Sequence, residues 1–326
     1  MEAPNARKHI ITACPVCGAG DFRFRFLVGQ DRLVRCHACH FAFLNPQPSD
    51  NELAAIYSQN YFLGAGQTAK EPVFARLKLR TAETYLDQLT AYAGFSHGRL
   101  LEIGSGSGSM LVAAARRGFD VTGVEYSEHA CQAARQRLAA EGLKGELVGG
   151  EIEAIADRKG EFDACVLADL IEHVRHPRQF LRMLRGVLRP GAVVLVATPS
   201  LDSWSARLMS ARWMEFKPEH LSYFNRRTLE RLLRSEGFQD LALAPGYKIL
   251  NYDYIQEHFE KFPTPFYTRA VKALGACLPP ALKSHELRLV ASGLVLLGRS
   301  GEPPASPRAA LEQPAARKAA GSAGPG

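Results

Sequence analysis

Long hydrophobic runs are absent from this chain of 326 residues, and its first stretch, MEAPNARKHI, has no apolar core. A membrane-spanning helix needs about 20 consecutive apolar residues, and a secretory signal peptide needs an apolar segment. The sequence therefore predicts no transmembrane segment, and we expect a cytoplasmic location.

A concentrated basic surface is also missing, although the formal net charge is +7 and the isoelectric point is about 9.1. The basic residues are dispersed in small groups, such as Arg116–Arg117 and Arg226–Arg227, and aromatic residues do not alternate with them. Nucleic-acid-binding domains gather lysine and arginine on one face. Nucleic acid is therefore not an expected partner, and nothing in the sequence indicates the oligomeric state.

Cysteine is too unevenly placed for a disulfide framework, because the chain has seven cysteines and four of them form two close pairs. Eighteen residues separate these Cys-x2-Cys pairs, which is a zinc-ribbon spacing, and each pair can wrap a tetrahedral zinc from one tight turn. The alternation of Phe22, Phe24 and Phe26 between the pairs predicts a hairpin strand. A redox dithiol or a chance grouping is the alternative. We expect a structural zinc on four ligands, Cys14, Cys17, Cys36 and Cys39.

From Arg99 onward, short apolar runs alternate with helical patterns, as they do in a parallel sheet with crossover helices. Strands are expected at residues 99–103, 120–126, 146–150, 162–170, 192–200, 240–245 and 291–299. Helices are expected at residues 72–94, 109–118, 127–142, 177–191 and 226–238. The fold class is therefore α/β.

The stretch RLLEIGSGSGSML, residues 99–111, places three glycines directly after the first of these strands. A glycine turn between a strand and a helix is the context of a ligand-binding loop, and ligands bind at the carboxyl ends of such strands. Glu125 ends the second strand, where an acid can accept both ribose hydroxyls of an adenosine. Glu102 would repel a pyrophosphate but suits a cationic ligand without phosphates, and the spacing disfavours a dehydrogenase.

These motifs resemble class I S-adenosylmethionine-dependent methyltransferases over residues 99–237. Glu102-Ile-Gly-Ser-Gly-Ser-Gly108 is similar to their motif I, and Val124-Glu125-Tyr126 to their acidic second-strand motif. The resemblance implies a doubly wound, seven-stranded Rossmann-like sheet and S-adenosylmethionine as the cofactor. The cofactor-binding residues that it implies are Glu102, Gly104, Ser105, Gly106, Gly108, Glu125, Tyr126, Glu151, Ile152 and Asp169. At 102 and 151 glutamate replaces the commoner aspartate.

The stretch ADLIEHVRHP and a later histidine carry the candidate catalytic residues, Asp169, Glu172, His173 and His220. A similar cluster holds a metal near the acceptor hydroxyl in ubiquinone-pathway O-methyltransferases and small-RNA 2′-O-methyltransferases, although Asp169 replaces a glutamate here. Three interpretations are open. The residues cap a helix and shape the pocket, or His173 or His220 acts as a general base, or the cluster binds a divalent metal.

The expected reaction is methyl transfer from S-adenosylmethionine to an oxygen of a small-molecule acceptor, such as a sugar, an aromatic or an isoprenoid intermediate. We expect the acceptor wall to include aromatic residues that follow the fifth strand, Trp204, Trp213, Phe216, Tyr223 and Phe224. The alternatives are an RNA methyltransferase that captures its substrate with the ribbon, and a regulatory protein that binds the cofactor without catalysis.

The sequence predicts four parts. They are a zinc ribbon over 1–48, a helical linker region over 49–97, a methyltransferase domain over 98–299 and a disordered tail over 300–326. The tail is rich in alanine, proline and glycine and has too few large apolar residues to offset its ordering entropy. An insertion at about 247–288 interrupts the domain with two helical patterns, of which the second is amphipathic and basic.

Overall fold

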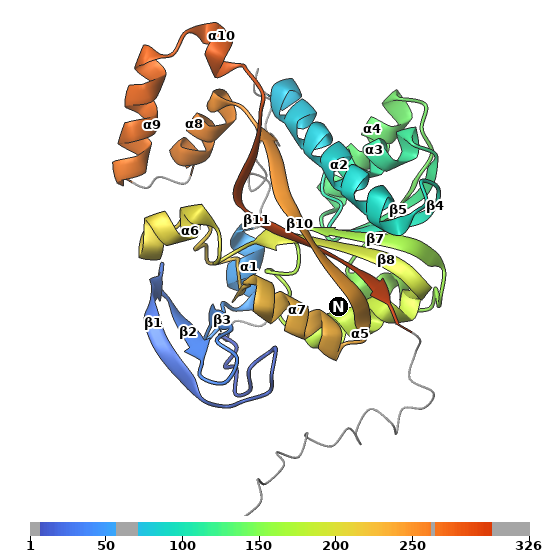
Figure 1. The fold of residues 1–326 in the computed structure, drawn as a ribbon, viewed down its shortest axis with the longest axis horizontal. Helices are drawn as coiled ribbons and strands as arrows, with labels where there is room; N and C mark the ends of the chain where they lie inside the picture. Colours follow the sequence, from blue (N-terminus) through green and yellow to red (C-terminus); the bar gives the residue numbers. More distant parts are fainter. Residues whose placement is uncertain (1–6, 57–70, 262–264, 302–326) are drawn as a thin grey trace, which may run out of the picture.

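A seven-stranded sheet forms the centre of the computed structural model, which describes residues 7–56, 71–261 and 265–301 (Figure 1). Its strands are β4 (Gly98–Ile103), β5 (Phe119–Glu125), β6 (Glu146–Gly149), β7 (Phe162–Ala168), β8 (Leu188–Pro199), β10 (Phe238–Leu250) and β11 (Leu287–Ser300). Their order is β10-β11-β8-β7-β4-β5-β6, and β11 runs antiparallel to both of its neighbours. The predicted doubly wound, seven-stranded sheet is confirmed. Strands that follow β4 are added on one side of it as β5 and β6, and then on its other side as β7 and β8. The switch point, where such sheets bind ligands, therefore lies between the parallel strands β4 and β7.

Helices cover both faces of this sheet because its central strands are apolar on both sides. Leu100 of β4 packs into a cluster with α2 (Glu71–Ala93), α3 (Ser109–Arg116) and α4 (Glu128–Ala140). The next residue, Leu101, packs on the other face with α5 (Pro177–Val187) and α7 (Arg226–Ser235). In the described part of the chain, none of the helices has both the length and the apolar character needed to cross a bilayer.

A second sheet of four strands contains the ribbon. It has the order β1 (Phe22–Val28), β2 (Asp31–Cys36), β3 (Ala42–Leu44) and β9 (Ser222–Tyr223). The first three strands follow one another in the chain, but β9 comes from the segment after β8 and pairs antiparallel with β3. The pairing is extended by the backbone N–H of Leu44, which donates to the carbonyl of Leu221 at 3.0 Å. The sequence did not predict β9, so the contact between ribbon and methyltransferase sheet is a finding of the structure.

Aromatic residues join the ribbon to the large sheet. Phe41 and Phe43 are fully buried and belong to the same apolar cluster as Leu101 and α7. The ring of Phe41 lies 5.0 Å from that of Phe224, which follows β9. The ribbon therefore shares its core with the sheet, as expected for a metal knuckle too small to form a core of its own.

Arginine contacts fix the chain where it leaves the ribbon. The guanidinium of Arg175, between β7 and α5, donates to the side chain of Gln47 at 3.1 Å and to the carbonyl of Pro48 at 3.1 Å. It also pairs with Asp50 at 2.9 Å, at the start of α1 (Asp50–Ile56). The ribbon and its following segment are thus joined to the large sheet's domain at two places, the β3–β9 pairing and the contacts of Arg175.

The largest differences from the predicted boundaries lie at the ends of β8, β10 and β11. β8 begins at Leu188, whereas residues 188–191 were expected to belong to the end of the helix over 177–191. β10 continues to Leu250 and β11 starts at Leu287, because the two strands pair with each other to their ends. Between them lie three helices instead of two, α8 (Tyr252–Lys261), α9 (Pro265–Cys277) and α10 (Pro280–Lys283).

The four-part division of the chain stays a prediction. Residues 302–326 of the expected tail lie outside the described residues, and so do residues 57–70 of the expected helical linker region. The remainder of that region is mostly α2, whose position over the sheet is clear in Figure 1.

The shared core predicts that a ribbon residue stabilises the whole protein. We expect Phe43→Ala to lower the free energy of unfolding by about 3–5 kcal/mol, because it leaves a cavity between ribbon and sheet. Phe24→Ala is the matched control, since this ring is 45% exposed and contacts Arg32, and it should cost less than about 1 kcal/mol. Chemical denaturation measures both values, and equal small losses would mean that the ribbon packs independently.

Candidate active site

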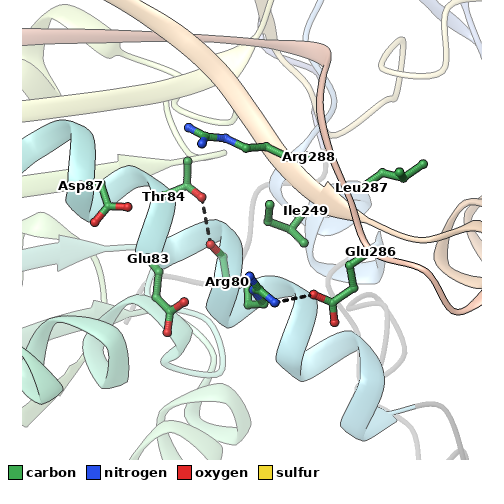
Figure 2. A pocket seen from close by; sticks show the side chains of 8 residues that line it. All are labelled: Arg80, Glu83, Thr84, Asp87, Ile249, Glu286, Leu287 and Arg288. Carbon is green, nitrogen blue, oxygen red and sulfur yellow. Dashed lines mark hydrogen bonds and ion pairs between the residues drawn. The ribbon is translucent and has the colours of Figure 1, made fainter.

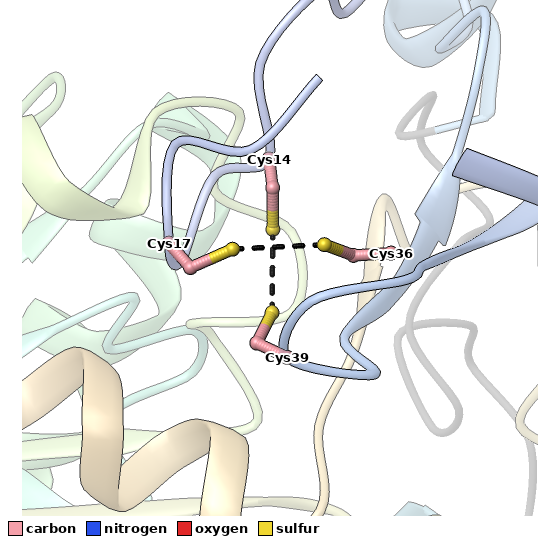
Figure 3. A group of neighbouring side chains, drawn as sticks. All are labelled: Cys14, Cys17, Cys36 and Cys39. Atoms are coloured by element: carbon pink, nitrogen blue, oxygen red, sulfur yellow. Dashed lines mark hydrogen bonds between the residues drawn. The ribbon is translucent and has the colours of Figure 1, made fainter. Parts of the chain in front are cut away.

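The four predicted zinc ligands lie together at one end of the ribbon (Figure 3). The sulfur atoms of Cys14 and Cys39 are 3.5 Å apart, and those of Cys17 and Cys36 are 3.6 Å apart. A tetrahedral zinc with Zn–S distances near 2.3 Å would hold its sulfurs ~3.8 Å apart. The four sulfurs therefore fit a zinc ion after small side-chain movements.

The three glycines of motif I serve different purposes, although all of them have a positive φ. A Cβ atom at Gly108 would lie 2.8 Å from the Cβ of Ala134, and one at Gly104 would lie 3.1 Å from the Leu170 side chain. A Cβ at Gly106 would meet no atom within 4 Å. Packing against Ala134 thus requires glycine at 108, Gly104 lies close against Leu170, and the space over Gly106 is open for a ligand.

Glu125 holds this loop. One of its carboxylate oxygens accepts a hydrogen bond from the backbone N–H of Gly106 at 2.8 Å, and the other accepts from the N–H of Ser127 at 2.9 Å. Each oxygen has a further lone pair, so the carboxylate can still accept a ribose hydroxyl. The side chain of Tyr126 is 73% exposed beside it.

The other residues of the expected cofactor set lie on both sides of this loop. The hydroxyl oxygen of Ser105 is buried and has no hydrogen-bond partner within the part of the chain that the structure describes. Ile152 is buried at the start of a 3₁₀ turn (Ile152–Ile155) beyond β6, and Glu151 precedes it at the surface. Burial, reinforced by the charges of Glu153 and Asp50, raises the pKa of Glu151.

A cavity of about 200 Å³ opens at the switch point, between α2, the carboxyl ends of β4 and β7, and β10. Its charged and aromatic lining residues are Lys78, Tyr85, Glu102, Asp169, Lys248 and Tyr254. Two of them, Glu102 and Asp169, were predicted from the sequence. The cavity lies next to the glycine loop and can receive the part of a ligand that extends beyond Gly106.

Glu102 is a buried acid without a full set of partners. It is 5% exposed, and its Oε2 atom has no hydrogen-bond partner among the described residues. Burial, reinforced by the charge of Glu125, raises the pKa of Glu102 well above its ordinary value. A positively charged ligand group in the cavity would compensate this carboxylate.

Asp169 has a partner that the sequence did not suggest. Its backbone turns into the left-handed region at the end of β7, with φ 51°, and its carboxylate pairs with the ammonium of Lys248 at 2.8 Å. Aspartate adopts this conformation more readily than most residues. The cavity therefore has an ion pair between the ends of β7 and β10.

The structure brings together three of the four predicted catalytic residues. One ligand atom from each of Glu172, His173 and His220 lies within 4.8 Å of the other two, and this group does not include Asp169. The rings of His173 and His220 are perpendicular, with their centres 4.7 Å apart. We call Glu172, His173 and His220 the acceptor triad. The sequence expectation of a four-residue cluster is thus met by three residues, because Asp169 faces Lys248.

Hydrogen bonds orient the acceptor triad. Oε2 of Glu172 accepts from the hydroxyl of Thr198 at 2.8 Å, whereas its Oε1 has no partner among the described residues. Nδ1 of His173 lies 2.9 Å from the carbonyl oxygen of Glu219. Because a carbonyl only accepts, this nitrogen carries the proton and Nε2 keeps its lone pair. Nδ1 of His220 is also buried and has no hydrogen-bond partner among the described residues.

Burial dominates the electrostatics of these three side chains. It raises the pKa of Glu172 to about 8, with a further contribution from Asp169, and it lowers the pKa of His173 to about 4. The pKa of His220 is also lowered well below its ordinary value by burial and by His173. The site therefore favours uncharged side chains until a ligand brings charge to it.

The aromatic residues expected to form an acceptor wall are largely used in packing, although the ring of Tyr223 lies 6.3 Å from that of His220. Trp213 and Tyr223 are buried in a cluster with the ribbon strands, and the ring of Phe216 lies 4.9 Å from that of Phe26. Phe224 belongs to the core of the sheet, and Trp204 is 61% exposed. None of the five lines the 200 Å³ cavity, where Tyr85 and Tyr254 supply the aromatic surface.

A larger cavity of about 310 Å³ lies between α2 and the start of β11 (Figure 2). Its charged lining is largely paired, since Arg80 contacts Glu286 at 3.0 Å, as Figure 2 shows. It contains none of the predicted site residues. We therefore assign no ligand to this cavity.

The methyltransferase domain family matches residues 76–243, which is more than half of the sequence. This chain belongs to that family. The assignment to the S-adenosylmethionine-dependent methyltransferases, made from motif I and the strands that follow it, is confirmed.

Two curated relatives are ubiquinone biosynthesis O-methyltransferases. The protein of Caulobacter sp. strain K31 is 38% identical over 101 residues, which cover 31% of this chain and 40% of the relative. That of Sinorhizobium medicae strain WSM419 is 31% identical over 154 residues, or 46% and 60% of the two chains. This methyltransferase thus spans only part of their length. The solved structure of the YcgJ protein from Bacillus subtilis covers 68% of this chain and 99% of its own, at 16% identity and a TM-score of 0.50. That likeness concerns the fold alone.

The sulfur geometry predicts one zinc per chain. We expect Cys36→Ser to release the metal and to loosen the ribbon sheet together with β9, because the cysteine ends β2 and is fully buried. Cys277→Ser is the control, since this cysteine is exposed and lies in α9. Elemental analysis of protein purified without oxygen measures zinc in all three forms, and its absence from the unaltered chain would reject the site.

The glycine geometry predicts different outcomes at two neighbouring positions. Gly106→Val should weaken S-adenosylmethionine binding at least tenfold and leave the protein folded, because its side chain enters open space and costs only about 1–2 kcal/mol of backbone strain. Gly108→Ala should lower the melting temperature markedly, because its methyl group clashes with Ala134. Calorimetry and thermal unfolding separate the two effects. Unchanged affinity in Gly106→Val would remove the cofactor from this loop.

Proposed function

We propose that this methyltransferase transfers the methyl group of S-adenosylmethionine to an oxygen atom of a small molecule. The observation that carries the proposal is the acceptor triad, of which Glu172 and His220 are buried and His173 is half-buried. Glu172 lies three residues along the chain from Asp169 in the cavity at the switch point. Asp169 and Lys248 line that cavity, and their charges act on Glu172. The names of the curated relatives support an oxygen acceptor of the aromatic or isoprenoid type. A sugar hydroxyl has the same chemistry.

The residues of this chain suit the cofactor. S-adenosylmethionine, when bound, supplies a methyl group on a sulfonium, and the displacement requires an acceptor lone pair in line with it. The open space over Gly106 and the carboxylate of Glu125 would hold the nucleoside. Glu102 would face the positive end of the ligand from the cavity floor. These residues would bind the cofactor and align its methyl group. The acceptor triad would activate the acceptor hydroxyl for methyl transfer.

The acceptor triad suits a divalent cation better than it suits a helix cap. It combines a carboxylate and two imidazoles, which are ligands that transition metals favour, and their atoms are close enough to reach one ion after a small approach. Two of the buried atoms, Oε1 of Glu172 and Nδ1 of His220, have no hydrogen-bond partner among the described residues. A bound cation would lower the pKa of an acceptor hydroxyl. Without one, His220 or His173 would accept the acceptor's proton directly.

Capture of RNA by the ribbon has less support. The rings of Phe22 and Phe26 contact Phe43 and Phe216, so they are used in packing. Phe24 is the most exposed of the three, with the guanidinium of Arg32 5.2 Å from the centre of its ring. A stacking platform for bases needs several free aromatic faces. A small-molecule acceptor is therefore the better proposal.

His220→Ala tests the acceptor triad. We expect the variant to bind S-adenosylmethionine as the unaltered protein does and to lose about 10²–10⁴-fold in turnover of an oxygen acceptor. His176→Ala is the control, because this histidine is exposed and lies outside the triad. Production of S-adenosylhomocysteine across a panel of aromatic, isoprenoid and sugar acceptors is the measurement.

Two further readouts separate base from metal ligand. If His220 acts as a general base, the rate of methyl transfer should rise with pH through the pKa of its imidazole and should not respond to chelators. If His220 is a metal ligand, chelators should abolish methyl transfer and divalent ions should restore it. His220→Ala should then bind less metal than the unaltered protein in calorimetry. Turnover at the unaltered rate in His220→Ala would reject both roles.

A further inference from the structure

Helix α9 of the insertion contributes no residue to the 200 Å³ cavity or to the acceptor triad. One side of it packs against α8, where the hydroxyl of Tyr252 donates to the carbonyl of Val271 at 2.6 Å. A Cβ atom at Gly275 would collide with the ring of Tyr252, so the two helices are in close contact. In Figure 1, α9 stands at the outer edge of the molecule, and α8 lies between it and β10. The packed side of α9 therefore fixes its orientation.

The opposite side of α9 is also apolar, although it is exposed. Phe266 is 72% exposed and Leu274 is 54% exposed. They belong to a stripe with the spacing of one helix face, whose exposed members are Phe266, Ala270, Ala273, Leu274 and Cys277. We call this stripe the α9 face. A helix on a protein surface normally has polar residues toward solvent, and a helix that is apolar all round is a buried one. The α9 face therefore has the composition of a surface that a partner covers.

Positive charge accompanies the α9 face. Arg269 and Lys272 are exposed and lie along one edge of it, because a helix turns by about 100° per residue. The only acid among residues 265–290 is Glu286, whose carboxylate is already paired with Arg76 of α2 at 2.8 Å. The same stretch has four basic residues, Arg269, Lys272, Lys283 and Arg288. A partner for this face should therefore be apolar inside and negatively charged at its surface.

Two kinds of partner could cover an apolar helix face, a second copy of this chain or a membrane. A second copy would bring the bases of one α9 close to those of the other, and like charges across an interface oppose binding. Anionic lipids attract such bases, and an amphipathic helix with an apolar face and flanking lysine and arginine lies in the headgroup region of a bilayer. We infer that the α9 face binds the surface of a membrane that contains anionic lipids.

This inference goes beyond the proposed function and does not depend on it. Phe266 and Leu274 would enter the boundary between headgroups and acyl chains, while Arg269 and Lys272 would contact lipid phosphates. Because α8 packs against α9 and carries Tyr254 to the cavity at the switch point, the insertion connects the bound surface with the candidate active site. An acceptor held in the bilayer would reach the enzyme from this side.

Sedimentation with lipid vesicles tests the inference. The unaltered protein should bind vesicles of equal parts phosphatidylcholine and phosphatidylserine at least about tenfold more tightly than vesicles of phosphatidylcholine alone. Leu274→Glu should weaken binding to the mixed vesicles about 10- to 100-fold, because the apolar contact of one leucine is lost. Leu27→Glu is the matched control, since Leu27 is 57% exposed and lies in β1, apart from α9 in Figure 1. It should leave binding within about twofold, because the attraction to the membrane falls off within a Debye length.

A second variant tests the charges and leaves the apolar stripe intact. Arg269→Gln combined with Lys272→Gln should weaken binding to the mixed vesicles about tenfold or more and leave binding to phosphatidylcholine unchanged. This variant decides the question even where Leu274→Glu does not fold, which circular dichroism would show.

Three results would overturn the inference. They are failure of the unaltered protein to bind the mixed vesicles, full binding by folded Leu274→Glu, and full binding by the double variant. Analytical ultracentrifugation without lipid provides the remaining check. A dimer that Leu274→Glu dissociates would assign the α9 face to a second copy and reject the membrane. None of these measurements uses a methyl donor or an acceptor, so the proposed function stands or fails separately.

Discussion

The pairing of β3 with β9 is the contact on which the arrangement of the candidate site depends. On one side, β3 pairs with β2, which ends at Cys36, one of the four clustered cysteines. On the other, His220 precedes β9, and the backbone N–H of Ser222 donates to the carbonyl of Glu172 at 3.0 Å. A short backbone ladder thus joins the ribbon to two members of the acceptor triad. The ribbon acts here as a structural support, which is a role that the spacing of its cysteines alone does not reveal.

The cavity is assembled from elements far apart in the sequence. Lys248 and Asp169 are 79 residues apart, and they meet because β10 lies at the edge of the sheet and extends past the ends of the central strands. Lys78 and Tyr254 reach the same cavity from α2 and α8. Binding of the cofactor and arrangement of the acceptor would therefore be coupled through packing around a single switch point. Glu102, buried below them, would be compensated only when the ligand is present.

Local patterns were sufficient for the large sheet, and they were insufficient where pairing alone creates structure. Alternating apolar runs and the glycines of motif I predicted all seven strands, because each run must be buried and each turn needs its glycine. The two residues of β9 have no periodicity to detect, and the prediction ended β10 five residues early, at Pro245, because the Pro245–Gly246 pair is a typical turn signal. The resemblance to metal-holding clusters of other O-methyltransferases pointed to the acceptor triad and also to Asp169, whose carboxylate pairs with Lys248 instead. Lys78 and Lys248 carry no motif, and only the fold relates them to Asp169.

The insertion between β10 and β11 leaves the sheet undisturbed, since the two strands pair on both sides of it up to Leu250 and Leu287. Its helices contribute Tyr254 to the cavity, while α9 exposes most of its surface. A segment attached in this way can change in length and sequence without cost to the strands that carry it. Residues 251–286 can therefore differ among related chains while the two strands that carry them stay paired.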